Sequence, residues 1–181
     1  MLKKTNKKGF TLIELIIVIA IMAILIALLA PNVLKYLEKS RVSKDVSALD
    51  SVHTAVKAET TDETLYKLST DDDQSNNNLQ GVTIESIKGA TSGELKTLSD
   101  RLFGENKSLG AEFETSAFLK SQAAKDSKVM VYLDGKGGIA IAAVNSDGLV
   151  DYEGTKFLVG NLEESALDLT LPAQTPVTPN P

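Results

Sequence analysis

The longest apolar stretch of this chain runs from Phe10 to Ala30, and Glu14 is its one ionisable residue. About 21 residues at ~1.5 Å rise per residue are enough to cross a ~30 Å hydrocarbon core. The basic residues before it are Lys3, Lys4, Lys7 and Lys8, and no further cation occurs until Lys35. The pattern predicts a membrane-spanning helix with its N-terminus in the cytoplasm and the rest of the chain exported.

After Pro31, apolar residues recur every three or four positions, which is typical of an amphipathic helix. The stripe consists of Val42, Val46, Leu49, Val52, His53 and Val56, and the charged residues Lys44, Asp45, Lys57 and Glu59 lie mostly elsewhere on the wheel. One helix is therefore predicted from about residue 10 to about residue 59, roughly 75 Å long. Pro31 predicts a kink, because proline removes one helical hydrogen bond, and local melting is the functional alternative.

The middle of the chain is harder to interpret. Residues 60–78 are mostly polar and predict a surface loop. Beyond them the pattern predicts a short strand at 82–84, a helix at 93–103 and a second short helix at 111–124. The last ten residues, 172–181, hold four of the five prolines and are expected to be extended and disordered.

Two β-branched apolar runs, 128–134 and 139–144, flank a glycine-rich connection and predict an antiparallel hairpin. After a turn at 145–148, residues 149–152 and 156–159 offer one or two further short strands, which extend the hairpin to a sheet of three or four strands. A sheet with one apolar face needs a cover, and the available element is the amphipathic helix at 33–59. The fold class is therefore α+β, with the N-terminal half of the long helix projecting alone.

Composition limits the chemistry that this chain is expected to perform. It has no cysteine and one histidine, so a histidine-centred triad or a multi-histidine metal site lacks parts, and no enzyme activity, metal or cofactor is predicted. His53 is interpreted as a packing residue with a satisfied ring nitrogen. Two clusters offer oxygen ligands for calcium, with a solvated loop or an ordinary turn as the simpler explanation. They are Asp71, Asp72 and Asp73 with Asn76, Asn77 and Asn78, and Asn145 with Asp147 and Asp151.

The junction before the apolar run differs from an ordinary secretory signal. No Ala-x-Ala cleavage motif follows the run, and the candidate cut lies before it. The segment Gly9-Phe10-Thr11-Leu12-Ile13-Glu14 resembles the prepilin leader of the type IV pilin and pseudopilin family. The resemblance covers only about the first fifth to quarter of the chain, but it joins a cleavage residue, an apolar helix and a carboxylate at fixed spacing.

This resemblance implies a division of the chain. Residues 1–9 would be a prepilin leader, 10–32 the transmembrane and filament-core half of the helix, 33–171 a globular head with the pilin fold, and 172–181 the tail. A prepilin peptidase would cut between Gly9 and Phe10 and the new N-terminus of Phe10 would be methylated. Glu14 would then pair with the Phe10 amine of a neighbouring subunit, whereas its simpler interpretation is a residue that reaches water at the membrane surface.

Removing residues 1–9 changes the formal net charge from −5 to −9, because four lysines leave with them. Such an acidic chain is not expected to bind nucleic acid.

Three functions remain open at this stage. The first is a pilin, stored in the cytoplasmic membrane as a single-pass protein and polymerised into an extracellular type IV pilus. The second is a pseudopilin of a type II secretion or DNA-uptake machine. The third is a membrane-anchored binding module or enzyme. For the first, the resemblance implies as partners other copies of the chain, a prepilin peptidase and N-methyltransferase, the pilus assembly platform with its ATPase, and the membrane before assembly.

Overall fold

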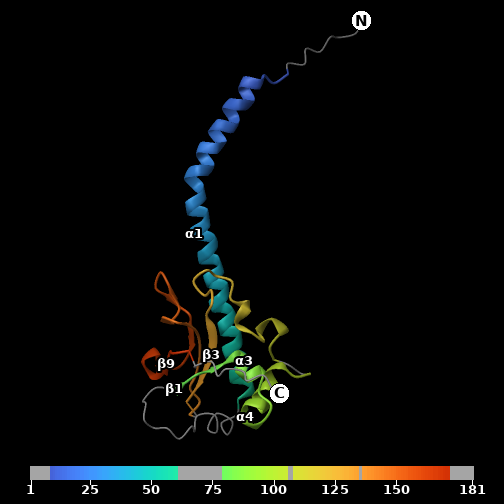
Figure 1. The fold of residues 1–181 in the computed structure, drawn as a ribbon, viewed down its shortest axis with the longest axis vertical. Coiled ribbons are helices and arrows are strands. Elements are labelled where there is room, and N and C mark those ends of the chain that lie inside the picture. The colour runs from blue at the N-terminus through green and yellow to red at the C-terminus, as the bar shows by residue number, and fades with distance from the viewer. Residues whose placement is uncertain (1–8, 61–78, 106–107, 135, 172–181) are drawn as a thin grey trace, which may run out of the picture. The chain divides into compact units, whose positions relative to one another are not determined.

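A computed structural model of the chain describes residues 9–60, 79–105, 108–134 and 136–171. The chain forms two compact units, Met1–Lys39 and Ser40–Pro181. Helix α1 (Leu12–Glu59) is 48 residues long and continues through Pro31 (Figure 1). The long helix predicted from about residue 10 to about residue 59 is confirmed. The leader residues 1–8, most of the predicted loop at 60–78 and the tail at 172–181 lie outside the described residues.

The elements that follow α1 are short. The helices are α3 (Ile84–Lys88) and α4 (Gly93–Phe103), with 3-10 helices at Ala111–Phe113, Ser116–Phe118 and Glu164–Ala166. The strands are β1 (Leu79–Gln80), β2 (Val82–Thr83), β3 (Lys128–Leu133), β4 (Ile139–Asn145), β5 (Gly148–Leu149), β6 (Asp151–Tyr152), β7 (Thr155–Lys156), β8 (Leu158–Gly160) and β9 (Leu167–Asp168).

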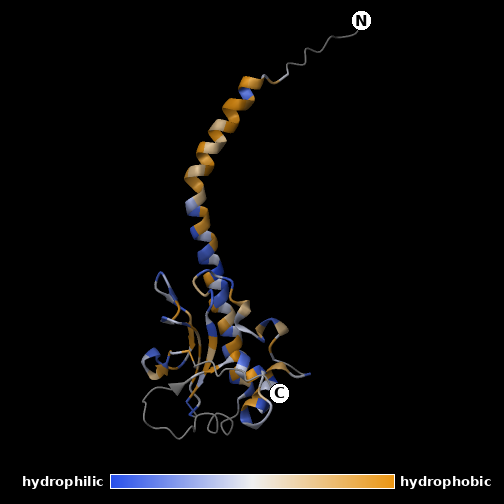
Figure 2. Cartoon of the chain, viewed as in Figure 1, coloured by the Kyte–Doolittle hydropathy of each residue, from blue (hydrophilic) through white to orange (hydrophobic). Residues whose placement is uncertain are grey.

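The first unit contains the apolar part of α1. Its large hydrophobic side chains, from Phe10 to Leu37, are 46–91% exposed, and Figure 2 colours most of this stretch of the ribbon as hydrophobic. By length and composition, this part of α1 is able to cross a membrane. Exposure of so much apolar surface indicates that lipid or other protein covers it.

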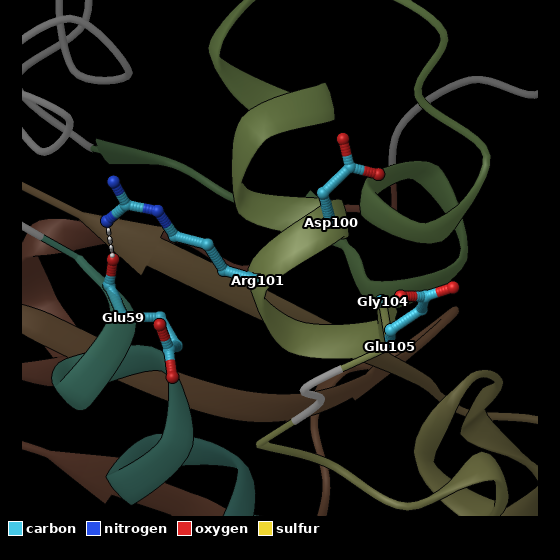
Figure 3. A pocket seen from close by; sticks show the side chains of 5 residues that line it. All are labelled: Glu59, Asp100, Arg101, Gly104 and Glu105. Carbon is cyan, nitrogen blue, oxygen red and sulfur yellow. Dashed lines mark hydrogen bonds between the residues drawn. The ribbon is translucent and has the colours of Figure 1, made fainter.

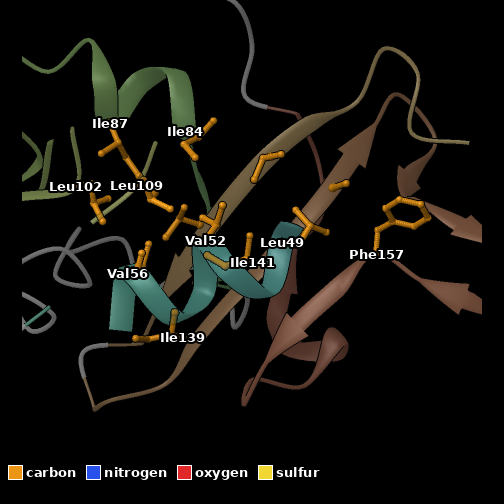
Figure 4. Close-up of a cluster of buried hydrophobic side chains, with 14 of the residues drawn as sticks. Leu49, Val52, Val56, Ile84, Ile87, Leu102, Leu109, Ile139, Ile141 and Phe157 are labelled. Atoms are coloured by element: carbon orange, nitrogen blue, oxygen red, sulfur yellow. The ribbon is translucent and has the colours of Figure 1, made fainter. Parts of the chain in front are cut away.

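In the second unit, α1 packs against one face of the sheet. Leu49, Val52 and Val56 are fully buried there beside Ile139 and Ile141 of β4 (Figure 4). Helices α3 and α4 add Ile84, Ile87, Leu98 and Leu102 to the same cluster. The predicted packing of the amphipathic helix on a small antiparallel sheet is confirmed, and the α+β class with it.

The hairpin of β3 and β4 is the centre of that sheet, as predicted. Six residue pairs join the two antiparallel strands, from Lys128 opposite Val144 to Leu133 opposite Ile139. Strand β2 pairs with β3, and β5 and β8 both pair with β4, which makes five strands instead of the predicted three or four. The residues predicted as one strand at 149–152 divide at Val150, because Asp151 and Tyr152 pair with β7 in a separate two-stranded hairpin.

The prediction of a single apolar face was wrong, because both faces of β3 and β4 are buried. On the face away from α1, Met130 and Tyr132 stand opposite Ala142 and Ala140, so that each large side chain meets a small one. The C-terminal segment covers this face. Its apolar side chains are Leu162, Leu167, Leu169 and Leu171.

The C-terminal segment is held by polar contacts as well as by packing. Strand β9 pairs with β1 in parallel, and the Tyr132 hydroxyl donates a 2.8 Å hydrogen bond to the carbonyl of Asp168. Burial raises the pKa of that hydroxyl well above its ordinary value. A Cβ at Gly81 would lie 2.6 Å from the Tyr132 ring, so only glycine fits where the chain passes this side chain.

Two predictions in the middle of the chain need correction. The strand predicted at 82–84 ends at Thr83, because the Thr83 hydroxyl accepts the Ser86 N–H and caps α3. The helix predicted at 111–124 is replaced by two 3-10 turns. Ser116 in this stretch bonds to other elements instead of to a helix of its own. Its N–H donates to the Glu85 carboxylate, and its hydroxyl accepts the Val129 N–H. The helix predicted at 93–103 is confirmed as α4.

Asp45, one of the charged residues that the sequence places mostly off the apolar stripe of the helix, is buried. Asp45 is 2% exposed, and its carboxylate accepts the N–H of Lys120 at 2.8 Å and 3.0 Å and the N–H of Ser121 at 2.7 Å. These bonds join α1 to a loop 75 residues away. A buried carboxylate needs such donors, because its desolvation is costly when it is unpaired.

We expect Asp45→Ala to reduce the free energy of unfolding by about 1.5–3 kcal/mol, the contribution typical of hydrogen bonds to a charged group. Chemical denaturation measures this effect. Asp50→Ala, a change to an exposed carboxylate of the same helix, is the control and should stay within about 0.5 kcal/mol of the parent. Equal stability of the two variants would show that the loop does not depend on Asp45.

Candidate functional site

The candidate site predicted at the start of α1 has a reciprocal hydrogen-bond arrangement. The Glu14 carboxylate accepts the backbone N–H of Thr11 at 2.8 Å and the Thr11 hydroxyl at 2.8 Å. In the other direction, the Glu14 N–H donates to the Thr11 hydroxyl oxygen at 3.4 Å. Thr11 immediately precedes the first helical residue, so this is a capping box, in which the helix end supplies its own partners.

The capping box supplies hydrogen-bond partners for the Glu14 carboxylate within a single chain. An ionised carboxylate in an apolar helix is unfavourable unless donors satisfy it. Here two donors of Thr11 do so, and the positive end of the helix dipole adds a favourable field. Glu14 thus has partners before any second chain arrives.

Thr11 is the residue that sequence reasoning missed at this site. The spacing Thr11-Leu12-Ile13-Glu14 matches the Ser/Thr-x-x-Glu signature of a capping box followed by an apolar run. The sequence therefore contained the signal for a capping box, but Glu14 was interpreted as a partner for a neighbouring subunit or as a residue that reaches water at the membrane surface.

Gly9 and Phe10 lie just before the helix and are exposed, Phe10 by 91%. A Cβ added at Gly9 would meet no atom within 4 Å, so the fold does not require glycine there. The backbone on both sides of the Gly9–Phe10 bond is open to another protein. Any need for glycine at this position comes from such a protein and not from packing.

Pro31 lies 17 residues after Glu14, about 25 Å along the helix. Glu14 and Pro31 are therefore too far apart to belong to one site. Pro31 has no N–H to donate, so the carbonyl four residues earlier lacks its helical partner.

The other candidate residues are not brought together. His53 is half-buried, as a packing residue would be. Its ring makes no hydrogen bond to another described residue, and the satisfied ring nitrogen stays a prediction. The Asn145 side chain accepts the Asp147 N–H and that of Asp151 accepts the Gly154 N–H, which are turn contacts. The cluster at 71–78 lies outside the described residues. Among the described residues, no three His, Cys, Asp or Glu side chains are arranged to hold a metal ion.

A cleft of about 580 Å³ lies beside the end of α1 and is lined by Glu59, Asp100, Arg101, Gly104 and Glu105 (Figure 3). The Arg101 Nη1 donates a 2.7 Å hydrogen bond to the Glu59 carbonyl, which satisfies an acceptor at the helix end. Asp100 pairs with Lys96. Of the polar groups in this cleft, Arg101 thus bonds to the end of α1, and Asp100 pairs within α4.

A smaller cleft contains Glu85, which links α3 to the loop at 115–117. Its carboxylate accepts the Ser116 N–H at 2.7 Å and lies 3.5 Å from the Lys128 ammonium. Burial acts to raise the pKa of Glu85, but the Ser116 hydrogen bonds and the Lys128 charge outweigh it and hold the pKa below its ordinary value. These contacts join α3 to the loop at 115–117 and to β3, which is a structural role.

Comparison with known proteins identifies the N-terminal segment. Residues 4–30 match the family described as the prokaryotic N-terminal methylation motif. Over 53 residues the chain is 45% identical to the type IV major fimbrial protein FimA of Dichelobacter nodosus, and over another match of 53 residues it is 43% identical to the type IV major pilin protein PilA of Myxococcus xanthus. Over 52 residues it is 50% identical to fimbrial protein Q of Moraxella bovis.

Each of these matches covers 29% of this chain and 34%, 24% and 33% of the respective relatives. The chain thus spans about a third or less of the length of the curated relatives that it matches. The comparison with solved structures found no match. Similarity to known proteins is therefore established for the N-terminal segment only. What is known of the second unit, Ser40–Pro181, here called the globular unit, comes from its structure alone.

The capping box predicts how Thr11 variants behave. Thr11→Val removes the hydroxyl and should destabilise the start of α1 by about 1 kcal/mol, the usual contribution of an N-cap side chain. Amide hydrogen exchange of the full chain in detergent micelles should then be faster at residues 12–15 only. Thr11→Ser keeps the hydroxyl and should exchange like the parent. Unchanged exchange in the valine variant would mean that Thr11 does not cap the helix.

Proposed function

We propose that this chain, whose N-terminal segment is similar to those of type IV pilins, is a structural subunit of an extracellular type IV pilus. The observation that carries the proposal is the combination at the start of α1. An open Gly9–Phe10 bond, a carboxylate held at the helix end and an exposed apolar helix follow one another within 30 residues. The relatives named as fimbrial and pilin proteins support it, and they do not favour a pseudopilin.

Processing is the first step of the proposal. A membrane peptidase cuts between Gly9 and Phe10 on the cytoplasmic side, and a methyl group is added to the new N-terminus of Phe10. The lysines of the leader keep that end in the cytoplasm while α1 crosses the membrane once. The pilus assembly platform and its ATPase then act on the processed chain.

Storage in the membrane depends on the capping box. The Glu14 carboxylate enters the apolar region with its hydrogen bonds to Thr11 already made, which lowers the cost of holding a charge there. Cleavage creates a cationic amine on Phe10, the residue next to Thr11. The processed chain thus carries one anion and one cation at the same helix end.

Assembly exchanges these partners between chains. When the apolar helices of several copies pack together, the amine of one copy reaches the Glu14 carboxylate of the next, and the two charges offset each other's desolvation in a medium of low dielectric constant. The third function, an anchored enzyme or binding module, needs neither a cleavable Gly9–Phe10 bond nor a carboxylate at residue 14.

Pro31 supplies the site at which α1 changes on assembly. Because one helical hydrogen bond is already missing there, local unwinding costs less than elsewhere in the helix. We expect residues near Pro31 to unwind in the filament, and a filament map with continuous helical hydrogen bonding through residues 25–35 would contradict this.

Sheared surface filaments test the proposed function directly. Intact-mass analysis should find this chain as a main component, beginning at Phe10 and carrying one methyl group. Gly9→Val should accumulate the uncut chain in the membrane at normal amounts, because the fold leaves room for a side chain at residue 9. Filaments that lack this chain, or a mature chain that begins elsewhere, would refute the proposal.

Glu14→Ala separates assembly from the earlier steps. Insertion and cleavage should be normal, because the change removes a charge from an apolar helix and lies five residues from the cut. Filament yield should fall to background, since each Phe10 amine loses its acceptor. Immunoblots of sheared and membrane fractions measure both quantities.

Glu14→Asp serves as the control, because it keeps the charge with a shorter reach and should assemble poorly instead of not at all. A normal yield from the alanine variant would show that Glu14 only reaches the membrane surface.

A further inference from the structure

Charge is distributed unevenly along this chain. Residues 33–44 carry four cations and one anion, a formal net charge of +3. Residues 45–171 carry 22 acidic and 11 basic side chains, a formal net charge of −11. The cations at 35–44, here called the basic segment, are Lys35, Lys39, Arg41 and Lys44.

The lysines of the basic segment are exposed and lack partners in the part of the chain that the structure describes. Lys35, Lys39 and Lys44 are exposed, and among the described residues none of them forms an ion pair or a side-chain hydrogen bond. Lys35 and Lys39 are four residues apart and share one face of α1. The structure thus presents these ammonium groups to another molecule.

The basic segment follows the apolar part of α1 directly. From Pro31 to Lys35 the helix rises only about 6 Å. When the apolar helices of several copies pack together, the segment lies where the packed bundle gives way to the globular units of other copies. Exposed charges act over about 8 Å at physiological ionic strength, so an acidic globular unit within that distance of the segment would be attracted to it.

We propose that the basic segment of one subunit docks on the acidic surface of the globular unit of a neighbouring copy. The proposal rests on the proposed function and adds to it a second contact between subunits. Residues 45–171 of neighbouring copies, each with a net charge of −11, repel one another in a filament, and the basic segment is a stretch of opposite sign in every copy. Each added subunit therefore supplies part of the charge that offsets this repulsion.

Charge reversal in the full-length chain tests this contact. Lys39→Glu with Lys44→Glu should accumulate processed protein in the membrane and lower the yield of sheared filaments by roughly tenfold or more, the effect of losing about 1.4 kcal/mol. Lys39→Arg with Lys44→Arg keeps the charges and should assemble normally. Lys125→Glu with Lys136→Glu is the matched control, because it makes the same change in net charge at exposed lysines of the globular unit.

A zero-length carbodiimide cross-linker, which joins amines to carboxylates in contact, identifies the partner. Parent filaments should yield covalent dimers that link Lys39 or Lys44 to an Asp or Glu of the globular unit. The arginine variant should form filaments without these links, because a guanidinium does not react. Detergent-dissociated subunits should not form them either.

Several outcomes would overturn the proposal. Normal filament yield from the reversed variant would do so, as would an equal loss in the Lys125 and Lys136 control, which would indicate a general effect of net charge. If amide exchange at residues 35–44 is slower in anionic than in neutral lipid vesicles for the parent but not for the reversed variant, the segment binds lipid headgroups instead. Filaments that lack this chain altogether would refute the proposed function, whereas normal filaments from the reversed variant would refute this inference alone.

Discussion

The need to satisfy one carboxylate in an apolar helix constrains the N-terminal part of this protein. Glu14 has no water to bind in the interior of a membrane or of a packed bundle, so its partners must come from protein. In the single chain those partners are the N–H and hydroxyl of Thr11. The same constraint makes a cationic amine at Phe10 a suitable partner in an assembled state. In the proposed filament, a charge that would otherwise be costly would thereby become a point at which two chains bind one another.

A comparable constraint shapes the globular unit, which has no cysteine to join its parts. Asp45 is buried in α1 and accepts the N–H groups of Lys120 and Ser121, so a charged side chain joins the helix to a distant loop. On the far face of the sheet, Tyr132 and the pairing of β1 with β9 hold the C-terminal segment over a second apolar layer. Hydrogen bonds to buried polar groups and two-sided packing of the sheet thus stabilise a small unit without covalent links.

The sequence predicted the elements with a strong local signal. The long helix, the helix at 93–103 and the hairpin of β3 and β4 all follow from periodicity and turn residues, which act over a few positions. It did not predict the role of Asp45, because the donors that satisfy it lie 75 residues away. The second apolar face was missed for a similar reason. Ala140 and Ala142 do not distinguish a buried face from an exposed one until Met130 and Tyr132 are known to lie opposite.

At the functional site, the signal for Gly9, Phe10 and Glu14 was local and strong, and their proposed roles rest on it. Thr11 was missed although its spacing to Glu14 is equally local, because two interactions compete for one carboxylate. Only the structure shows that Glu14 accepts a hydrogen bond from Thr11 of its own chain. The lysines of the basic segment were visible in the sequence, but only the structure shows that none of the residues it describes pairs with them.

The central claim is that the Glu14 carboxylate exchanges a partner in its own chain for one in a neighbouring chain. A cryo-electron-microscopy map of the native filament, at a resolution that shows side chains, tests this most directly. The account predicts that the Glu14 carboxylate of each subunit lies within hydrogen-bond distance of the Phe10 amine of an adjacent subunit. A map in which Glu14 remains bound only to Thr11 of its own chain, with the Phe10 amine of every neighbour elsewhere, would contradict it.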